Sequence, residues 1–377
     1  MSQLQALIGE LYEAGYHPES TIKKSMAATG RDAVGLFPLF LPEELVYAAG
    51  FLPVGLWGGI SGFQLADKYL QSFCCSIMRA NMELALKGSY GNLKAILIPS
   101  QCDTLKCVCE NMKVALPQVP VIGVTVPHNR TIAGAHTQML EEFRYIADAL
   151  GKVPGGEAHA IPVEEAFAVY EGYREVMMDF IQIVPRYLNT INAKVRHYLM
   201  KAAYFMDKTE YTQKMNALLA ELKKQPEEAF SGTKVVATGI MIDAEPVLDL
   251  LVDLNISVVD DLLCHESMQF RTKTRSEESV LSKMAYRLLD LQGASPLYEP
   301  GKPRGLLLAD MAKAHQADAV LFCLLKFCDP EAFDQPLVKK DLTDRGVPML
   351  SIEMDQHVDS IGQLRTRIQG FLEMNIT

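Results

Sequence analysis

Short apolar runs alternate with longer amphipathic segments in two parts of the chain. In the first part, four runs have the length expected of buried strands, and segments with helical spacing separate the later ones. The expected strands cover residues 33–37, 52–57, 95–99 and 119–126, and the expected helices cover 72–86, 103–116 and 133–150. Residues 1–30 fit an amphipathic helix and a turn. Helices between strands predict a parallel sheet with right-handed crossovers.

The same alternation returns towards the C-terminus. The expected strands cover residues 235–240, 256–260, 319–323 and 347–352, and the expected helices cover 246–252, 278–291, 306–315 and 361–373. Residues 163–224 repeat apolar positions at helical spacing and contain no strand pattern. The predicted fold is therefore α/β, with two Rossmann-like units with parallel sheets and a helical segment between them. The predicted domains are 1–156 (N-terminal α/β), 157–232 (helical) and 233–377 (C-terminal α/β).

Two of the expected strands run into a Cys-Asp step, Cys102-Asp103 and Cys328-Asp329. Each step places a thiol just beyond the carboxyl end of a strand, with an Asp that can cap a following helix. Ligands of open α/β sheets bind at that edge. Both steps follow the third strand of a unit, which indicates an internal duplication of the fold, although any two α/β units can share such a pattern. Two thiols presented in this way suggest one inorganic ligand shared by both units.

A third thiol candidate lies in the pair Cys74-Cys75, at the start of an expected helix. Helix N-termini favour thiolates, because free N–H groups and the helix dipole stabilise negative charge. Three such thiols fit an iron–sulfur cluster held between the units. Structural zinc fits less well, since it usually takes four protein ligands in short paired spacings, and the sequence has no such pattern.

The other cysteines are expected to play no part in this site. Cys107 and Cys109 lie two residues apart on an expected helix, so they point in different directions and are interpreted as packing or solvent thiols. Cys264 and Cys323 are interpreted as core residues. Cys74 is adjacent to Cys75, and neighbouring residues do not easily bind one cluster together.

Composition narrows the class of protein. The chain has 377 residues, of which 49% are hydrophobic and 22% charged, as in ordinary globular proteins. The net charge of −10 argues against binding to nucleic acid or to an anionic membrane surface. The N-terminus lacks the pattern of a signal peptide, and no apolar run is long enough for a transmembrane helix. We therefore expect a cytoplasmic protein that binds neither nucleic acid nor membranes.

Three polar or glycine-rich segments have simple interpretations. Glu43-Glu44 fits the start of a helix, where carboxylates are favourable. Trp57-Gly58-Gly59 is either a plain turn or a place where the backbone approaches a ligand. The segment 128–130, His-Asn-Arg, could contact a coenzyme A (CoA) phosphate or a subunit interface, and a solvated loop is the simpler interpretation.

Taken together, several motifs resemble the 2-hydroxyacyl-CoA dehydratase family, which is related to the ATP-dependent benzoyl-CoA reductases. The matching stretches are residues 42–58, Cys75-Ser76-Ile77, Cys102-Asp103-Thr104-Leu105, Phe327-Cys328-Asp329-Pro330-Glu331 and residues 365–369. The run from Ala48 to Gly58 is more similar to the beta subunit than to the alpha subunit. The resemblance implies a [4Fe-4S] cluster held by Cys75, Cys102 and Cys328, with a non-protein ligand on the fourth iron. Cys75 matches the motif better than Cys74 because Ser-Ile follows it.

The resemblance also implies a reaction and its partners. The chain would be the beta-type subunit of an oxygen-sensitive (R)-2-hydroxyacyl-CoA dehydratase, in a heterodimer with a homologous alpha subunit. An ATP-dependent iron–sulfur activator protein would supply one electron, and the thioester would become a ketyl radical that loses water to give a 2-enoyl-CoA. The 2-hydroxyacyl-CoA substrate would bind at the partner subunit, so this subunit would relay the electron.

Two alternatives stay open at this point. One is a subunit of a benzoyl-CoA-reductase-like enzyme, in which the same parts deliver electrons for net reduction. The other is a non-catalytic scaffold that binds a cluster or zinc. The sequence does not identify the acyl group of a substrate or a residue that transfers protons.

Overall fold

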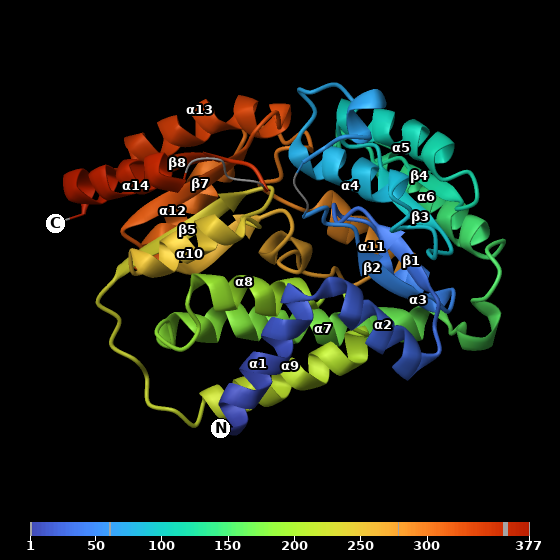
Figure 1. Cartoon of the computed structure of the whole chain (residues 1–377), viewed down its shortest axis with the longest axis horizontal. Helices are drawn as coiled ribbons and strands as arrows, with labels where there is room; N and C mark the ends of the chain where they lie inside the picture. The colour runs from blue at the N-terminus through green and yellow to red at the C-terminus, as the bar shows by residue number, and fades with distance from the viewer. Residues whose placement is uncertain (1, 60–61, 278, 357–360, 377) are drawn as a thin grey trace.

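Two α/β units stand side by side above a layer of helices (Figure 1). The computed structural model describes residues 2–59, 62–277, 279–356 and 361–376. The first unit lies on the right in Figure 1 and the second on the left, with the helical layer beneath both. None of the helices in the described ranges has the length and hydropathy needed to cross a bilayer.

The first unit is built on a four-stranded parallel sheet with strand order β2-β1-β3-β4. Its strands are β1 (Ala33–Leu36), β2 (Leu52–Gly55), β3 (Ile96–Pro99) and β4 (Val121–Val124). Its helices are α3 (Glu43–Ala48), α4 (Ser76–Leu86), α5 (Asp103–Ala115) and α6 (Ala135–Leu150). Strands β1, β2 and β3 are apolar and fully buried, as expected of a parallel sheet covered on both faces.

The second unit repeats this architecture with strand order β6-β5-β7-β8, again all parallel. Its strands are β5 (Thr233–Gly239), β6 (Ile256–Leu263), β7 (Ala319–Leu325) and β8 (Met349–Met354). Its helices are α10 (Glu245–Asp253), α11 (Val280–Leu289), α12 (Arg304–Ala314), α13 (Asp329–Asp344) and α14 (Ile361–Asn375). In both units the second strand is at one edge and the third lies next to the first, so the two sheets share one topology.

The predicted fold class is confirmed, and all eight expected strands are present. The main difference is β6, which continues to Leu263, beyond the expected end at residue 260. Asp260 and Asp261 account for this difference. Both carboxylates are buried inside the strand, where Asp261 is paired with Arg196, and Asp260 with Arg271 and with His315 at 3.1 Å. Pairing makes these charges tolerable in a core.

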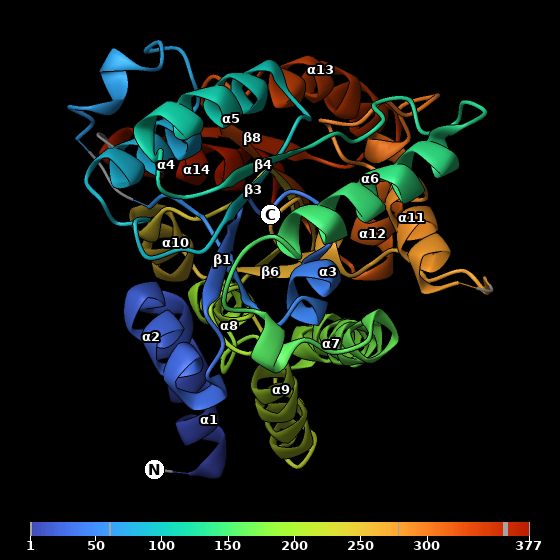
Figure 2. The same cartoon turned by 90° about the vertical axis from the view of Figure 1, so that its right-hand side faces the viewer.

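The helical layer contains segments from two distant parts of the sequence. It consists of α7 (Val163–Ile183), α8 (Ala193–Ala202), α9 (Lys208–Leu222), α1 (Gln3–Tyr16) and α2 (Pro18–Thr29). Helix α1 packs against α8 and α9 (Figures 1 and 2). Gly15 permits this contact, because a Cβ atom at this position would lie 2.1 Å from the carbonyl oxygen of Tyr198 on α8. The domain limits at residues 156 and 232 stay predictions.

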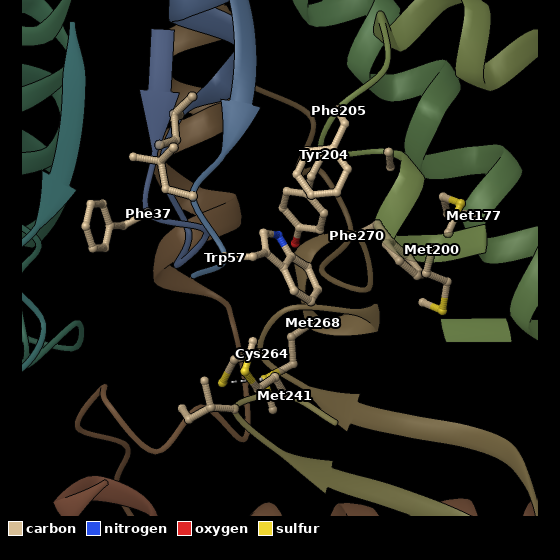
Figure 3. Close-up of a cluster of buried hydrophobic side chains, with 14 of the residues drawn as sticks. Phe37, Trp57, Met177, Met200, Tyr204, Phe205, Met241, Cys264, Met268 and Phe270 are labelled. Carbon is tan, nitrogen blue, oxygen red and sulfur yellow. Dashed lines mark hydrogen bonds between the residues drawn. The ribbon is translucent and has the colours of Figure 1, made fainter. Parts of the chain in front are cut away.

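One apolar core connects both units with the helical layer (Figure 3). Phe37 and Trp57 come from the first unit, Tyr204 and Phe205 follow α8, and Met268 belongs to the second unit. The Trp57 ring meets the ring of Tyr204 edge-on, with 5.0 Å between centroids. Burial of large side chains from all three parts stabilises their relative positions.

The loop after β4 also connects the two units. Asn129 forms a parallel bridge with Tyr298 of the second unit. The Arg130 guanidinium is buried and donates hydrogen bonds to the carbonyl oxygens of Leu288, Leu289 and Leu291 at the end of α11. The interpretation of this segment as a solvated loop is therefore wrong: a basic side chain here satisfies the free carbonyls at a helix C-terminus.

Candidate metal centre

The loops that follow the carboxyl ends of both sheets meet between the units. Gln356, just after β8, donates from Nε2 to the Trp57 carbonyl oxygen at 2.7 Å and accepts from the Gly59 N–H at 3.1 Å. Its own backbone N–H lies 3.5 Å from the hydroxyl of Ser76, the first residue of α4. Gly58 and Gly59 have φ values of 74° and 86°, a conformation that favours glycine. This turn therefore forms the contact between the units beside Cys75.

Each of the three predicted ligands is the residue that precedes a helix. Cys75 is the N-cap of α4, Cys102 that of α5 and Cys328 that of α13. The Cys102 sulfur accepts a hydrogen bond from the Leu105 N–H at 3.4 Å. The expectation that the following Asp caps the helix is wrong. Asp103 and Asp329 are instead the first helical residues, where a carboxylate interacts favourably with the helix dipole.

The three thiols come from both units and lie near enough to influence one another. Burial is the main cause that raises the pKa of Cys75, and a charge on Cys102 adds to it. Burial also raises the pKa of Cys328, and charges on Glu331, Cys75 and Cys102 add to it. All three side chains are partly buried. Phe73 and Phe327, close to these cysteines in sequence, are more than half exposed, so the edge of the site reaches the surface. Phe327 has a φ of 60°, an unusual value for a bulky residue in the turn before Cys328.

Burial controls the ionisation of these thiols in the protein alone. It raises the pKa of Cys75 to about 12, although the nearby Met78 N–H acts in the opposite direction. Burial also raises the pKa values of Cys102 and Cys328, again against helix N–H groups. Helix N-termini therefore do not suffice to make thiolates here, contrary to the simple expectation. A bound cationic centre would supply the missing stabilisation, because metal binding displaces thiol protons.

The remaining cysteines have other surroundings. Cys74 is buried, and its pKa is raised mainly by burial, with a side-chain hydrogen bond to Thr104 acting in the opposite direction. Cys107 is exposed, as expected of a solvent thiol, and Cys109 is buried against Gly123. Cys264 and Cys323 are fully buried core residues, as predicted.

A site for one metal ion has no support. Within the part of the chain that the structure describes, no group of three or more His, Cys, Asp or Glu side chains could hold a metal ion. An iron–sulfur cluster requires a wider spacing of the thiolates, because each thiolate binds a different iron of the cluster.

Gln101 provides a direct test of whether the residues suit a larger group. This side chain precedes Cys102 and is 2% exposed, and neither its amide oxygen nor its amide nitrogen has a partner among the described residues. A buried amide without partners costs about 1–3 kcal/mol per unpaired group. An iron–sulfur cluster accepts hydrogen bonds at its sulfurs and would give the amide nitrogen a partner. The donor set and this unpaired amide therefore fit a cluster.

The sequence does not reveal the role of several buried or paired polar residues, two of them close to the predicted ligands. Gln101 adjoins a predicted ligand, so its position in the sequence could have identified it. Gln356 could not have been found in that way, because only the fold brings the end of β8 to Trp57. Glu44 fits a simple helix start in the sequence, yet it is buried and paired with Arg174 at 2.9 Å and with Arg287, which ties α3 to α7 and α11.

Comparison with known proteins identifies the family of this chain. Residues 38–375 match the sequence model of the family described as 2-hydroxyglutaryl-CoA dehydratase, D-component. The chain belongs to this family. The resemblance inferred from the cysteine motifs is thus confirmed.

Full-length relatives of this dehydratase family member carry specific names. It is 37% identical to the (R)-phenyllactyl-CoA dehydratase beta subunit of Clostridium sporogenes, over 99% of this chain and 100% of the relative. It is 36% identical to the lactoyl-CoA dehydratase subunit beta of Anaerotignum propionicum, with the same coverage. It is 22% identical to one of the benzoyl-CoA reductase subunits of Thauera aromatica, over 92% of both chains. Its named relatives therefore include beta subunits of dehydratases, as the motifs predicted.

Proposed function

We propose that this chain is the beta-type subunit of a cytoplasmic, oxygen-sensitive (R)-2-hydroxyacyl-CoA dehydratase, and that Cys75, Cys102 and Cys328 hold a [4Fe-4S] cluster. The observation that supports the proposal is that each of these thiols directly precedes a helix, Cys75 and Cys102 in the first unit and Cys328 in the second. Family membership and the names of the full-length relatives support the dehydratase reaction. Identity to the dehydratase subunits is higher than to the benzoyl-CoA reductase protein, which favours dehydration over reduction.

The residues of the chain have distinct tasks in this proposal. The cluster, when bound, would supply one-electron transfer. The three cysteines would fix its position, and the N–H groups of Met78 and Leu105, which already stabilise negative charge on Cys75 and Cys102, would influence its potential. Gln101 would donate a hydrogen bond from its buried amide. Burial keeps bulk water away from the thiols, whereas the exposed edge at Phe73 and Phe327 leaves a short route for an electron.

The proposed reaction needs further proteins. A homologous alpha subunit would bind the 2-hydroxyacyl-CoA, and an ATP-dependent iron–sulfur activator protein would inject the electron. The thioester would take up the electron as a ketyl radical anion, expel the 2-hydroxyl group and lose a β-proton, and return of the electron would then leave the 2-enoyl-CoA. No residue of this chain is assigned to proton transfer.

A reconstituted assay tests this proposal. The purified chain, an alpha subunit, the activator and ATP are combined without oxygen and given, in separate reactions, lactyl-, phenyllactyl-, 2-hydroxyglutaryl- and benzoyl-CoA. We expect a 2-enoyl-CoA product from at least one substrate and none when this chain or ATP is omitted. Net reduction of benzoyl-CoA without dehydration of any 2-hydroxyacyl-CoA would contradict the proposal.

A further inference from the structure

A buried carboxylate lies one helical turn after Cys328. Glu331 is the third residue of α13, and the residue is 0% exposed. The side chain of an N-cap residue normally faces the N–H groups of the second and third helical residues. The second residue here is Pro330, which has no N–H group, so the Glu331 N–H is the one that can face the Cys328 sulfur. Burial raises the pKa of Cys328, and the nearby Glu331 N–H acts in the opposite direction.

Neighbouring segments of the second unit fix the Glu331 carboxylate. Arg304, at the start of α12, donates to both carboxylate oxygens, at 2.9 and 3.0 Å, and Ser295 donates from its hydroxyl. The Arg304 guanidinium also donates to the Thr238 hydroxyl on β5, from Nε at 3.1 Å and from Nη2 at 2.8 Å. All four residues are buried. The first turn of α13 is therefore anchored to the sheet of the second unit.

The charge of this carboxylate acts on the Cys328 sulfur. After burial, the charge on Glu331 is the largest cause that raises the pKa of Cys328. Pairing with Arg304 makes this charge tolerable in the core. A fixed negative charge that opposes a thiolate also opposes one-electron reduction of a cluster bound to that thiolate, because reduction adds one negative charge to the site.

We propose that Glu331 is a positioning residue for Cys328, which holds the first turn of α13 against Arg304 and Ser295 and lowers the reduction potential of the cluster. The inference rests on the proposed function, because it concerns the cluster, and it adds a residue that binds no iron. One electron enters the site on reduction and leaves it on oxidation, and no bond to Glu331 forms or breaks. A lower potential makes the reduced site a stronger electron donor.

Redox titration of the full-length chain, purified without oxygen and followed by electron paramagnetic resonance of the reduced cluster, tests the proposal. Glu331→Gln keeps the size of the side chain and removes its charge. We expect reduction to become about tenfold more favourable, a shift of about 59 mV for one electron. Glu331→Asp keeps the charge and should stay near the potential of the unchanged protein. Ser295→Ala removes a hydrogen bond that partly offsets the charge, so its potential should shift in the opposite direction, to a lower value.

Asp334→Asn provides the matched control. Asp334 lies one turn further along α13, is paired with Lys302 at 2.9 Å and lies 3.7 Å from the Arg304 guanidinium. This variant also removes a buried carboxylate beside Arg304, but one farther along the helix from Cys328. Its shift in potential should therefore be less than half that of Glu331→Gln.

Two results would overturn the inference. One is a Glu331→Gln protein that holds the cluster at the potential of the unchanged protein, and the other is an equal shift in Glu331→Gln and Asp334→Asn. If Glu331→Gln does not fold, Ser295→Ala decides, and an unchanged or higher potential then overturns the inference. The proposed function stands in all these cases, because the chain still holds the cluster. Lack of iron and sulfide in the unchanged chain would instead overturn the proposed function together with this inference.

Discussion

Adjacent cysteines differ sharply in this protein. Burial raises the pKa of both thiols, and charges on Cys102, Cys74 and Asp355 add to the effect on Cys75. The N-cap position makes the difference, because Cys75 precedes α4 directly and Cys74 lies one residue further from it. The preference for Cys75 as a ligand stays a prediction.

Thiol reactivity should follow these surroundings. In the cluster-free chain at pH 8, iodoacetamide should alkylate the exposed Cys107 first. Cys75 should react far more slowly, because burial raises its pKa to about 12 and the thiolate is the reactive form. Mass spectrometry of tryptic peptides over time measures the order, and denatured protein, in which all cysteines react, is the control. Equal rates for Cys75 and Cys107 would contradict the described burial.

The buried Glu44 should make stability depend on acid pH. Burial alone raises the pKa of this carboxyl, but Arg287 and Arg174 outweigh it and lower the pKa to about 2, below the usual 4.5. The ionised carboxylate therefore stabilises the folded state above pH 4.5, and this contribution is lost as pH falls towards 2. Glu44→Gln should cost about 3 kcal/mol at pH 7, because it leaves two guanidinium groups with Glu171 as their one remaining carboxylate among the described residues.

Urea unfolding between pH 3 and 7 measures this effect. The variant should lose less stability than the unchanged protein as the pH falls below 4.5. Glu164→Gln on α7 alters an exposed carboxylate and serves as control, with an expected change within about 0.5 kcal/mol. If Glu44→Gln behaved like this control, the ion-pair cluster would not hold α3, α7 and α11 together.

At the scale of single residues, the sequence predicts the thiols better than their surroundings. Cys102 and Cys328 are visible because each follows an apolar strand. Gln101 and Glu44 look like ordinary polar residues, since nothing in the local sequence reveals that their side chains are buried. Glu44 finds Arg174 and Arg287 at separations of more than 100 residues, which only the tertiary fold can bring together.

Secondary structure elements are predictable where their pattern is local. The buried strands β1, β3, β5 and β7 are short apolar runs bounded by polar residues, so their positions follow from the sequence. The end of β6 is not predictable, because two Asp residues interrupt its apolar run. The place of α1 is also hidden, since an amphipathic pattern shows that a helix needs a partner and does not say which one.

Two glycines on α1 provide a matched test of its packing on α8. Gly15→Ala would place a Cβ atom 2.1 Å from the Tyr198 carbonyl oxygen, so α1 would have to move, at a cost of about 1–3 kcal/mol. A Cβ atom at Gly9 would meet nothing within 4 Å, and Gly9→Ala should stabilise the helix by about 0.5–1 kcal/mol. Thermal unfolding of both variants measures the difference. Destabilisation by Gly9→Ala equal to that of Gly15→Ala would contradict the contact.

On the scale of the whole molecule, a repeated sheet topology explains how the site arises. Strand order is the same in both sheets, and in each unit the third strand, which pairs with the first, is followed by a Cys-Asp step. When loops at the carboxyl ends meet, as Gln356 and Trp57 do, these steps come together. The third thiol, Cys75, comes from the loop before α4 in the first unit. A pair of related units can therefore share one ligand that neither unit surrounds alone.

The iron and sulfide content of protein purified without oxygen tests the central claim most directly. The unchanged chain should carry about four irons and four sulfides, the composition of a [4Fe-4S] cluster. Cys75→Ser, Cys102→Ser and Cys328→Ser should each lose most of both, whereas Cys74→Ser and Cys107→Ser should retain them. Zinc in place of iron, or loss of iron in Cys107→Ser with retention in Cys328→Ser, would contradict the account.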